Sequence, residues 1–369
     1  MAPNRRDLVF ATLNLANLQL PGAPMYPRSR LYDDATYAQK VAWTAGMLRR
    51  LDADVIAFQE LWSPQALVDV LAAAGLAGTH RTAFIKEGGW DGIAVACAVR
   101  RPWEIRAHRR HKAFPDGFRL IKRDRSMADI RADPPAADLA DALAEGEPLL
   151  ASHEDDGVDV AIHAFARSVL QVTVGHGEVG DVPPIEVFCT HLKSRLPTRL
   201  DDPEYRDDRL RPHAVALGAA LSTIRRTAEA AALRVILDAV MKGGDTPVAV
   251  LGDLNDGTLS NTVAILGDQP SYRVYADSWA ARRNDDGLYT AAVMQALRTL
   301  GPNPHTYVHK NIEEIIDHVL VSEQFYEHSR RRHWAFREMR VLNDHLHEAD
   351  PAHGDHGAVR VAFDWWPAD

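Results

Sequence analysis

A buried strand that runs directly into a polar cluster most restricts what this chain can fold into. Residues 247–257, P-V-A-V-L-G-D-L-N-D-G, contain four aliphatic residues in a row, Val248 to Leu251. Such a run, bounded by Pro and Gly, is typical of a central strand covered on both faces. Gly252 would let the chain turn, and Asp253 and Asn255 would point the same way if it stayed extended. Catalytic groups gather at such strand ends, although this segment alone also suits an Asx turn.

Four further apolar runs of strand-like length lead into polar residues in the same way. They are Leu8–Leu13 before Asn14, Asp54–Phe58 before Gln59 and Glu60, Ile185–Thr190 before His191, and Glu314–Ile316 before Asp317 and His318. A last run, Ala358–Phe363, follows G-D-H-G, which contains Asp355 and His356. Carboxylates at the ends of apolar strands are costly unless a cation, a histidine or hydrogen bonds compensate them. Four acidic groups therefore require such partners: Glu60, Asp253, Asp317 and Asp355.

The ordered set of these segments resembles the endonuclease/exonuclease/phosphatase superfamily, which has the DNase I-like fold. The matching stretches are A-T-L-N, I-A-F-Q-E-L, C-T-H-L-K-S, L-G-D-L-N-D, I-D-H-V-L-V-S and G-D-H-G. Each is weak alone, but six in the family's order, spanning residues 8–363, are specific. The resemblance implies an α/β fold, a four-layer α/β/β/α sandwich of two packed mixed β-sheets flanked by helices. It also implies a single domain over residues 1–369.

A metal-assisted attack of water on a phosphoester is the reaction that the resemblance implies. Asn14, Glu60 and Asp355 would form the metal site. Oxygen ligands without cysteine favour Mg²⁺ (or Mn²⁺) as the cofactor. Lys193, which follows His191 by two residues in C-T-H-L-K-S, is a candidate for substrate binding.

The family's pattern also implies a catalytic role for each of five other residues. Asp253 and Asn255 would position the attacking water and stabilise the pentacovalent state. His356, held in one tautomer by Asp317, would act on the nucleophile or on the phosphoryl oxygens. His191 would contact the phosphate and protonate the leaving group.

Two assignments in this region stay open. The family pairs the residue equivalent to His191 with a glutamate, but neither Glu87 nor Asp91 of this chain matches it cleanly. Near the C-terminus, H-L-H-E-A-D-P-A-H-G-D-H carries four histidines that could instead form a zinc or other transition-metal site: His345, His347, His353 and His356.

The regular pattern of strands and helices is lost between Arg100 and about Gly157. Arg100 to Arg125 holds ten basic and three acidic residues, a local charge of +7, and Asp129 to Asp159 is acidic. We therefore expect a charged insert at about residues 100–160. Such blocks usually form solvated loops or short surface helices. The alternative is that the basic half contacts a polyanionic substrate through Arg106, Arg109 and Arg110.

The composition fits a globular enzyme, with 46% hydrophobic and 25% charged residues. A net charge of −9 argues against a surface that embraces DNA as a whole. No signal peptide and no membrane span are visible. Cys97 and Cys189 lie in apolar runs and are expected to be buried thiols, which suggests a cytoplasmic protein.

We therefore predict a Mg²⁺-dependent phosphoester hydrolase, with a phosphodiesterase or nuclease as the leading form. The expected partner is a phosphoester substrate, with nucleic acid among the candidates, and neither a membrane nor an obligatory protein partner is expected. A phosphomonoesterase or a lipid or inositol phosphoesterase of the same superfamily is the alternative. A non-catalytic binding protein on this scaffold would be expected to lack some of the residues named above, and all are present.

Overall fold

The computed structural model describes residues 4–26, 29–84, 92–122, 158–268, 287–299, 304–348, 350 and 352–368. Contacts divide the chain into two units, Met1–Pro115 with Ala164–Asp369, and Asp116–His163. The second unit falls within the expected charged insert. In its described part, β6 (Leu120–Lys122) pairs antiparallel with β7 (Val158–Val160). Most of the acidic stretch 129–159 lies outside the described residues, and so do residues 272–279, for which the sequence predicts a short extended segment.

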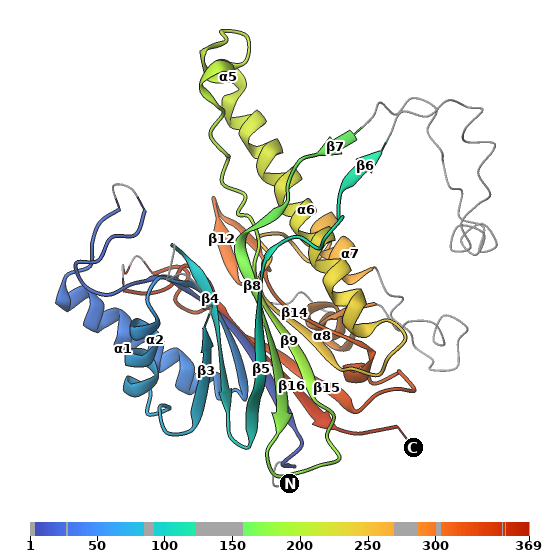
Figure 1. The fold of residues 1–369 in the computed structure, drawn as a ribbon. Coiled ribbons are helices and arrows are strands. Elements are labelled where there is room, and N and C mark those ends of the chain that lie inside the picture. The colour runs from blue at the N-terminus through green and yellow to red at the C-terminus, as the bar shows by residue number, and fades with distance from the viewer. Residues whose placement is uncertain are drawn as a thin grey trace, which may run out of the picture. The chain divides into compact units, whose positions relative to one another are not determined.

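Two mixed six-stranded sheets form the first unit, as the sequence predicts (Figure 1). In order across the first sheet, the strands are β15 (Trp334–Leu342), β16 (Ala358–Trp365), β1 (Leu8–Leu18), β2 (Val55–Leu61), β4 (Ala94–Arg100) and β3 (His80–Phe84). Across the second they are β11 (Tyr289–Thr290), β14 (Asp317–Val321), β10 (Val248–Asp253), β9 (Ile185–His191), β8 (Ala164–His176) and β5 (Trp103–Ala113). A short hairpin pairs β12 (Tyr307–His309) with β13 (Ile312–Glu314). β1 with β2 and β9 with β10 are parallel pairs.

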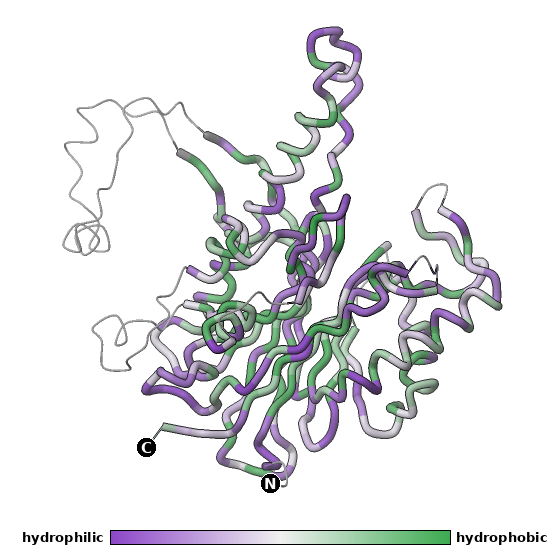
Figure 2. The backbone as a smooth tube through the Cα atoms, turned by 180° about the vertical axis from the view of Figure 1, so that it is seen from behind, coloured by the Kyte–Doolittle hydropathy of each residue, from purple (hydrophilic) through white to green (hydrophobic). Residues whose placement is uncertain are grey.

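Alternating side chains of β1 build two separate hydrophobic cores. Leu8 and Phe10 belong to the core that also contains Leu251 of β10, so this core lies between the two sheets. Val9 and Ala11 belong to the core against the helices on the other face. A strand buried on both faces reads as a continuous apolar run, which explains why the sequence marks these strands so clearly. Figure 2 shows the hydrophobic residues concentrated along the central strands.

Helices flank the paired sheets on both sides (Figure 1). The described helices are α1 (Asp34–Leu51), α2 (Pro64–Ala73), α5 (Asp202–Arg206), α6 (Ala214–Met241), α7 (Asn261–Gly267) and α8 (Ala291–Thr299), with 3₁₀ turns η1 (Arg211–His213) and η3 (Glu323–Phe325). α5 lies beyond the sheets, near the N-terminal end of α6 (Figure 1). The sequence predicts an N-cap for α1 at Asp33 or Asp34, and Asp33 accepts a hydrogen bond from the Thr36 amide. Among the described helices, none has the length and hydrophobicity needed to cross a bilayer.

Two expectations about secondary structure were wrong. The basic stretch after Arg100 was expected to be a loop or short helix, but residues 103–113 form β5, the edge strand of the second sheet. Buried Trp103 starts the strand, whereas several charged side chains along it are exposed, and charges on an edge strand discourage pairing with other chains. Glu314–Ile316 was expected to be a strand leading into Asp317. Instead β13 ends at Glu314, and Asp317 begins β14.

Candidate active site

Three strands of the second sheet bring polar residues side by side at one edge. Asp253 ends β10, and it is paired with His191 at the end of parallel β9 and with Asp317 at the start of antiparallel β14. Asp317 reaches this edge because β14 runs in the opposite direction. Gly252 lies within β10 rather than at a turn, and a Cβ there would lie 2.0 Å from the carbonyl oxygen of Thr190. Only glycine therefore allows β9 and β10 to approach this closely.

His356 lies just before β16 of the first sheet, and its side chain lies beside these three residues. Its Nδ1 lies 2.9 Å from Oδ2 of buried Asp317, and its ring packs against Tyr307 at 4.9 Å between centroids. Burial alone would lower the pKa of His356, but the negative charges of Asp317 and Asp253 outweigh it and raise that pKa well above its ordinary value. His356 is therefore an imidazolium at neutral pH, with Asp317 fixing Nδ1 as a donor.

Asp253 is fully enclosed among these groups. Burial raises its pKa to about 7, with the protonated His356 opposing the shift and Asp317 adding to it. Its Oδ2 lies 3.4 Å from Nε2 of His191, and its Oδ1 accepts a hydrogen bond from the Asn255 amide at 2.7 Å. A carboxyl group with a pKa near neutrality can exchange protons at physiological pH.

The first sheet contributes Asn14 and Glu60 through irregular backbone. Near Glu60, the pairing of β2 shifts register against both of its neighbours, β1 and β4. Glu60 itself has φ +57°, in the left-handed region. Such a bulge re-aims a side chain at the end of a strand. Asn14 lies 3.4 Å from Oδ2 of Asp253 through its Nδ2 and also bonds Glu60, so the polar ends of both sheets meet here. Left-handed backbone at a non-glycine residue costs free energy, so the surrounding structure must hold Glu60 in this conformation.

The site has the charge and the ligand types that a divalent cation requires. Burial raises the pKa of Glu60, and the nearby carboxylate of Asp355 raises it further. The carboxylates of Asp253 and Asp317 lie within 4.8 Å of each other, beside the charged ring of His356. Oδ1 of Asp317 is buried and has no hydrogen-bond partner among the described residues. Carboxylates that repel one another in a buried site fit a bound cation.

Asn255 does not have the orientation expected from its spacing. It has φ +55°, so the chain is not extended after Asp253. Its Nδ2 donates a hydrogen bond to the carbonyl oxygen of Leu192, across to the end of β9. The neighbouring Asp256 accepts hydrogen bonds from Arg226 and Thr262, so it ties α6 and α7 to the strand end.

His191 is deeply buried, and the pKa of its ring is shifted in the opposite direction from that of His356. Burial lowers the pKa of His191 well below its ordinary value, and the charges of Arg167 and His356 lower it further. It is therefore neutral at physiological pH. Nε2 faces Asp253, whereas Nδ1 has no hydrogen-bond partner among the described residues. The residues considered as its acidic partner, 87 and 91, lie outside the described part of the chain.

Lys193, expected to bind substrate, holds its ammonium group on its own loop. Nζ donates to the carbonyl oxygens of Ser194 and Leu196 at 3.2 and 3.1 Å. The Lys193 amide donates to the buried carboxylate of Glu229 on α6. These contacts give Lys193 a part in shaping the loop after His191.

Arg106 lies at the end of the sheets opposite the site. It donates a hydrogen bond to the carbonyl oxygen of His176 and lies 3.6 Å from Glu104. His176 in turn contacts the carbonyl oxygen of Arg5, just before β1 begins. Because Asn14 follows six residues into β1, about 20 Å of strand separates this end from the site. A substrate at the strand ends could reach Arg106 only if it extended along the sheet.

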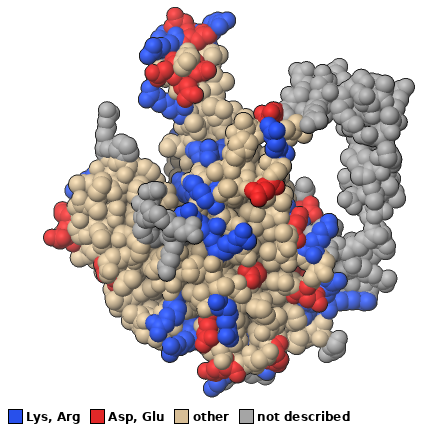
Figure 3. Space-filling model, viewed as in Figure 1, with Lys and Arg blue, Asp and Glu red and all other residues tan. Residues whose placement is uncertain are grey.

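Arg109 and Arg110 occupy the middle of β5, opposite Gln171 and Leu170 of β8. In Figure 3, basic groups on the face that shows β5 are separated mainly by uncharged residues, with acidic groups beside some of them. In the second unit, Arg119 pairs with Asp159 at 3.7 Å. The basic side chains of β5 are therefore spread along an edge strand, and at least Arg106 has an acidic neighbour.

Two basic residues of the site were missed by the sequence analysis. Arg167, near the start of β8, donates a hydrogen bond to the Leu192 carbonyl oxygen, and its charge acts on both Glu60 and His191. Lys40 on α1 is 1% exposed, and burial lowers its pKa to about 8, although Asp355 and Glu60 oppose the shift. Neither carries a sequence signal, because an arginine before an apolar run and a helical lysine are ordinary surface patterns.

The C-terminal histidines do not gather into one site. Nε2 of His345 bonds the carbonyl oxygen of His356 at 2.9 Å, which makes it a support for the loop. His353 lies 2.8 Å from the carboxylate of Glu348. His347 lies elsewhere, beside residues of the β12–β13 hairpin. The spacing of the histidines along the sequence therefore did not indicate which of them lie together.

Comparison with known proteins places this arrangement in a family. The family model described as Endonuclease/Exonuclease/phosphatase family matches residues 39–343. No curated protein matched in sequence. A solved endonuclease/exonuclease/phosphatase family protein from Bacteroides thetaiotaomicron is 14% identical, covers 98% of each chain and has a TM-score of 0.52. A mannosyl-6-phosphatase of the same organism is 14% identical, over 97% of this chain and 100% of that one, with a TM-score of 0.52.

The human Nocturnin catalytic domain with bound sulfate is 11% identical, over 99% of this chain and 97% of that one, with a TM-score of 0.50. At such identities the solved structures show a shared fold and no more. The family model spans most of the sequence, including Glu60, His191, Asp253 and Asp317. The chain therefore belongs to the endonuclease/exonuclease/phosphatase family, whose members hydrolyse phosphoesters.

Proposed function

We propose that this chain is a Mg²⁺-dependent phosphoester hydrolase that acts best on phosphodiesters. The convergence of Asp253, Asp317 and His356 within 4.8 Å, beside a second buried histidine, carries the proposal. No other group of buried titratable residues in the described part of the chain combines carboxylates with an imidazolium in this way. Such a set suits the attack of water on a phosphorus centre, where charge builds on several oxygens at once.

Asn14, Glu60 and Asp355 would hold the cation, because they supply oxygen ligands of high negative charge at the meeting point of the two sheets. Oxygen donors without sulfur favour Mg²⁺ or Mn²⁺. When bound, the cation would neutralise charge on the phosphate and lower the free energy of the transition state. Lys40 would compensate part of the carboxylate charge when the cation is absent.

The remaining roles follow from protonation states. Asp253, with a pKa of about 7, would accept a proton from the attacking water. His356, charged and fixed by Asp317, would donate a hydrogen bond from Nε2 to a phosphoryl oxygen. Neutral His191 would contact the leaving oxygen. Arg167, whose charge already acts across the site, would bind a non-bridging oxygen in place of the role expected for Lys193.

The balance of charge favours a diester over a monoester. Four carboxylates stand against Arg167, Lys40, the charged His356 and one divalent cation, so the site has little excess positive charge. A diester adds one negative charge at neutral pH, and a monoester adds nearly two. The fold does not decide between them, since one solved neighbour is named a mannosyl-6-phosphatase.

Hydrolysis of bis-p-nitrophenyl phosphate and p-nitrophenyl phosphate tests this directly. With Mg²⁺ or Mn²⁺, we expect kcat/KM to be at least about tenfold higher for the diester, and to vanish in excess chelator. Plasmid, single-stranded DNA, RNA and sphingomyelin should be assayed in parallel to define the substrate class. Glu60→Gln, which should need a higher concentration of the cation, is the matched control. A preference for the monoester would reject the diester proposal, and full activity in chelator would reject metal dependence.

A further inference from the structure

A second cluster of metal-binding residues lies outside the site described above. It consists of His305, just before β12, Glu313 on β13, and His347 in the turn after β15. Each offers a ligand atom, and these atoms lie within 4.8 Å of one another. We propose that His305, Glu313 and His347 bind a transition-metal ion, with Zn²⁺ the best match. For brevity, these three residues are called the hairpin cluster.

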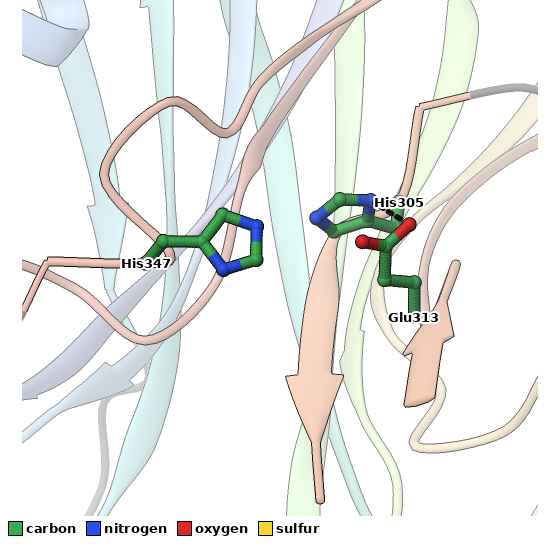
Figure 4. A group of neighbouring side chains, drawn as sticks. All are labelled: His305, Glu313 and His347. Carbon is green, nitrogen blue, oxygen red and sulfur yellow. Dashed lines mark ion pairs between the residues drawn. The ribbon is translucent and has the colours of Figure 1, made fainter. Parts of the chain in front are cut away.

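An unpartnered nitrogen in the cluster points toward the place where an ion would bind. His305 Nδ1 lies 3.0 Å from Glu313 Oε2, which fixes the orientation of the ring. His305 Nε2 is buried and has no hydrogen-bond partner among the described residues. In Figure 4 this nitrogen points toward the imidazole of His347, and the two ring centroids are 5.9 Å apart. Burying an imidazole nitrogen without a partner costs free energy, and a bound ion would remove that cost.

The ligand types distinguish this cluster from the active site. Two imidazoles and one carboxylate suit Zn²⁺ and related ions, whereas the oxygen ligands beside Asn14 suit Mg²⁺. Ligand atoms around tetrahedral zinc lie about 3.4 Å apart, given bonds of about 2.0–2.1 Å. Closing the cluster from 4.8 Å therefore requires a small movement. His347 can supply it, because it is exposed and lies in a turn.

The alternative is an ordinary ion pair between His305 and Glu313, with His347 solvated nearby. That reading accounts for Nδ1 of His305, but it leaves the buried Nε2 without a partner. It also gives no reason for His347 to approach the hairpin from a distant part of the sequence. An ion bound by Nε2 of His305 and by His347 accounts for both observations, and Glu313 would have to turn from Nδ1 of His305 toward the ion to become its third ligand.

A bound ion would fasten the segments that surround His356. The backbone of Tyr307, two residues after His305, forms a β-bridge with His356. Asn343 donates a hydrogen bond to the His305 carbonyl oxygen at 2.9 Å, and His345 bonds the His356 carbonyl oxygen at the same distance. The hairpin cluster would add a third link between the hairpin and the loop that leads to His356, and so would stabilise the loop against opening.

Metal binding to untagged protein tests the proposal without any turnover. We expect wild-type protein to bind one equivalent of Zn²⁺ more than His347→Ala, measured by equilibrium dialysis in excess Mg²⁺ at micromolar Zn²⁺. Co²⁺ in place of Zn²⁺ should give the intense visible absorption of a low-coordinate site, and His305→Ala and His347→Ala should abolish it. Zn²⁺ should also raise the Tm of the wild type by more than that of His347→Ala.

Control variants separate this cluster from other histidines and from the active site. His309→Ala removes an exposed histidine of β12 outside the cluster and should keep the Co²⁺ absorption and the Zn²⁺ stoichiometry. Glu60→Gln should keep them as well, because Glu60 lies in the other site. Equal Zn²⁺ stoichiometry in wild type and His347→Ala, or an unchanged Co²⁺ spectrum in that variant, would overturn the proposal. Exposed His347 and Glu313 allow substitution without loss of folding.

Discussion

The active-site cluster and the hairpin cluster use the same kinds of side chain in opposite surroundings. Asp253, Asp317 and His356 are almost completely buried at strand ends, whereas Glu313 and His347 are exposed on a hairpin and a turn. In the buried cluster the fold imposes the charge states, raising the pKa of Asp253 to about 7 through burial. In the exposed cluster water screens the charges, so a bound ion must supply most of the order.

This difference indicates what each cluster can do. A buried carboxylate and imidazolium are held in their reactive protonation states before substrate arrives, which is a requirement of catalysis. An exposed set of ligands can adjust its geometry to a bound ion. Substitutions in the buried cluster should therefore change turnover and stability together, and those in the hairpin cluster should change metal binding.

The largest effect is expected from His356→Ala. Removing the imidazolium takes away a charge-assisted donor to the phosphoryl group, so kcat should fall by about a thousandfold or more, with KM changed little. Steady-state kinetics on bis-p-nitrophenyl phosphate, with circular dichroism to confirm folding, would measure it. His328→Ala, a partly exposed histidine near Glu327, is the matched control and should retain wild-type turnover. A well-folded His356→Ala enzyme with near-normal kcat would remove His356 from the chemistry.

Glu60→Gln should separate the two clusters by their metals. Loss of one oxygen ligand should weaken Mg²⁺ or Mn²⁺ binding by about tenfold or more, because a metal that prefers its own water needs every carboxylate. Zn²⁺ binding at the hairpin cluster should stay the same. Calorimetric titration of each cation into wild type and variant would measure both. Unchanged Mg²⁺ affinity would exclude Glu60 as a ligand.

Asp253→Asn should expose the cost of burying a carboxylate. Burial raises the pKa of Asp253 from 3.8 to about 7, so the folded chain keeps a proton that the unfolded chain loses. This contribution to stability is present below pH 3.8 and is lost as the pH rises toward 7. In chelator, the variant should therefore be more stable than wild type at pH 8, and the gap should shrink by about 2 kcal/mol at pH 5.

Thermal and denaturant unfolding at the two pH values would measure this gap. Asp245→Asn changes a carboxylate whose side chain is 74% exposed, so it is a suitable control and should give no gap that varies with pH. If the free energies of unfolding of Asp253→Asn and wild type change in parallel from pH 5 to pH 8, then burial does not raise the pKa of Asp253.

The smallest effect is expected at the exposed basic edge. Arg106 lies beside Glu104 at the end of the sheets opposite the active site. A phosphate contact contributes about 0.9 to the log–log slope of affinity against salt. Arg106→Ala should therefore change the salt dependence of nucleic-acid cleavage by much less than this. Arg109→Ala with Arg110→Ala, nearer the middle of β5, serves as the comparison. If Arg106→Ala lowers the slope by a full unit, Arg106 contacts a polyanionic substrate, which is the alternative that the sequence left open.

Much of the architecture could be predicted because its signals are local. The apolar runs before Asn14, Glu60, His191 and Asp253 mark strands buried on both faces, and burial selects hydrophobic residues without interruption. The cap at Asp33 is likewise a matter of a few neighbouring residues. The order of the motifs indicated the sandwich, and the two mixed sheets of the structure confirm it.

Long-range contacts determined what the sequence could not. Arg167 and Lys40 enter the site because β8 and α1 pack beside it, and neither residue differs in sequence from a surface cation. Asn255 turns away from its expected direction because left-handed backbone brings its amide to the Leu192 carbonyl oxygen. β5 is a strand because β8 offers it an edge, whatever its charged residues suggest in isolation. Local propensity specifies an element, but its charged neighbours and their protonation depend on which distant segments the fold brings within a few ångströms.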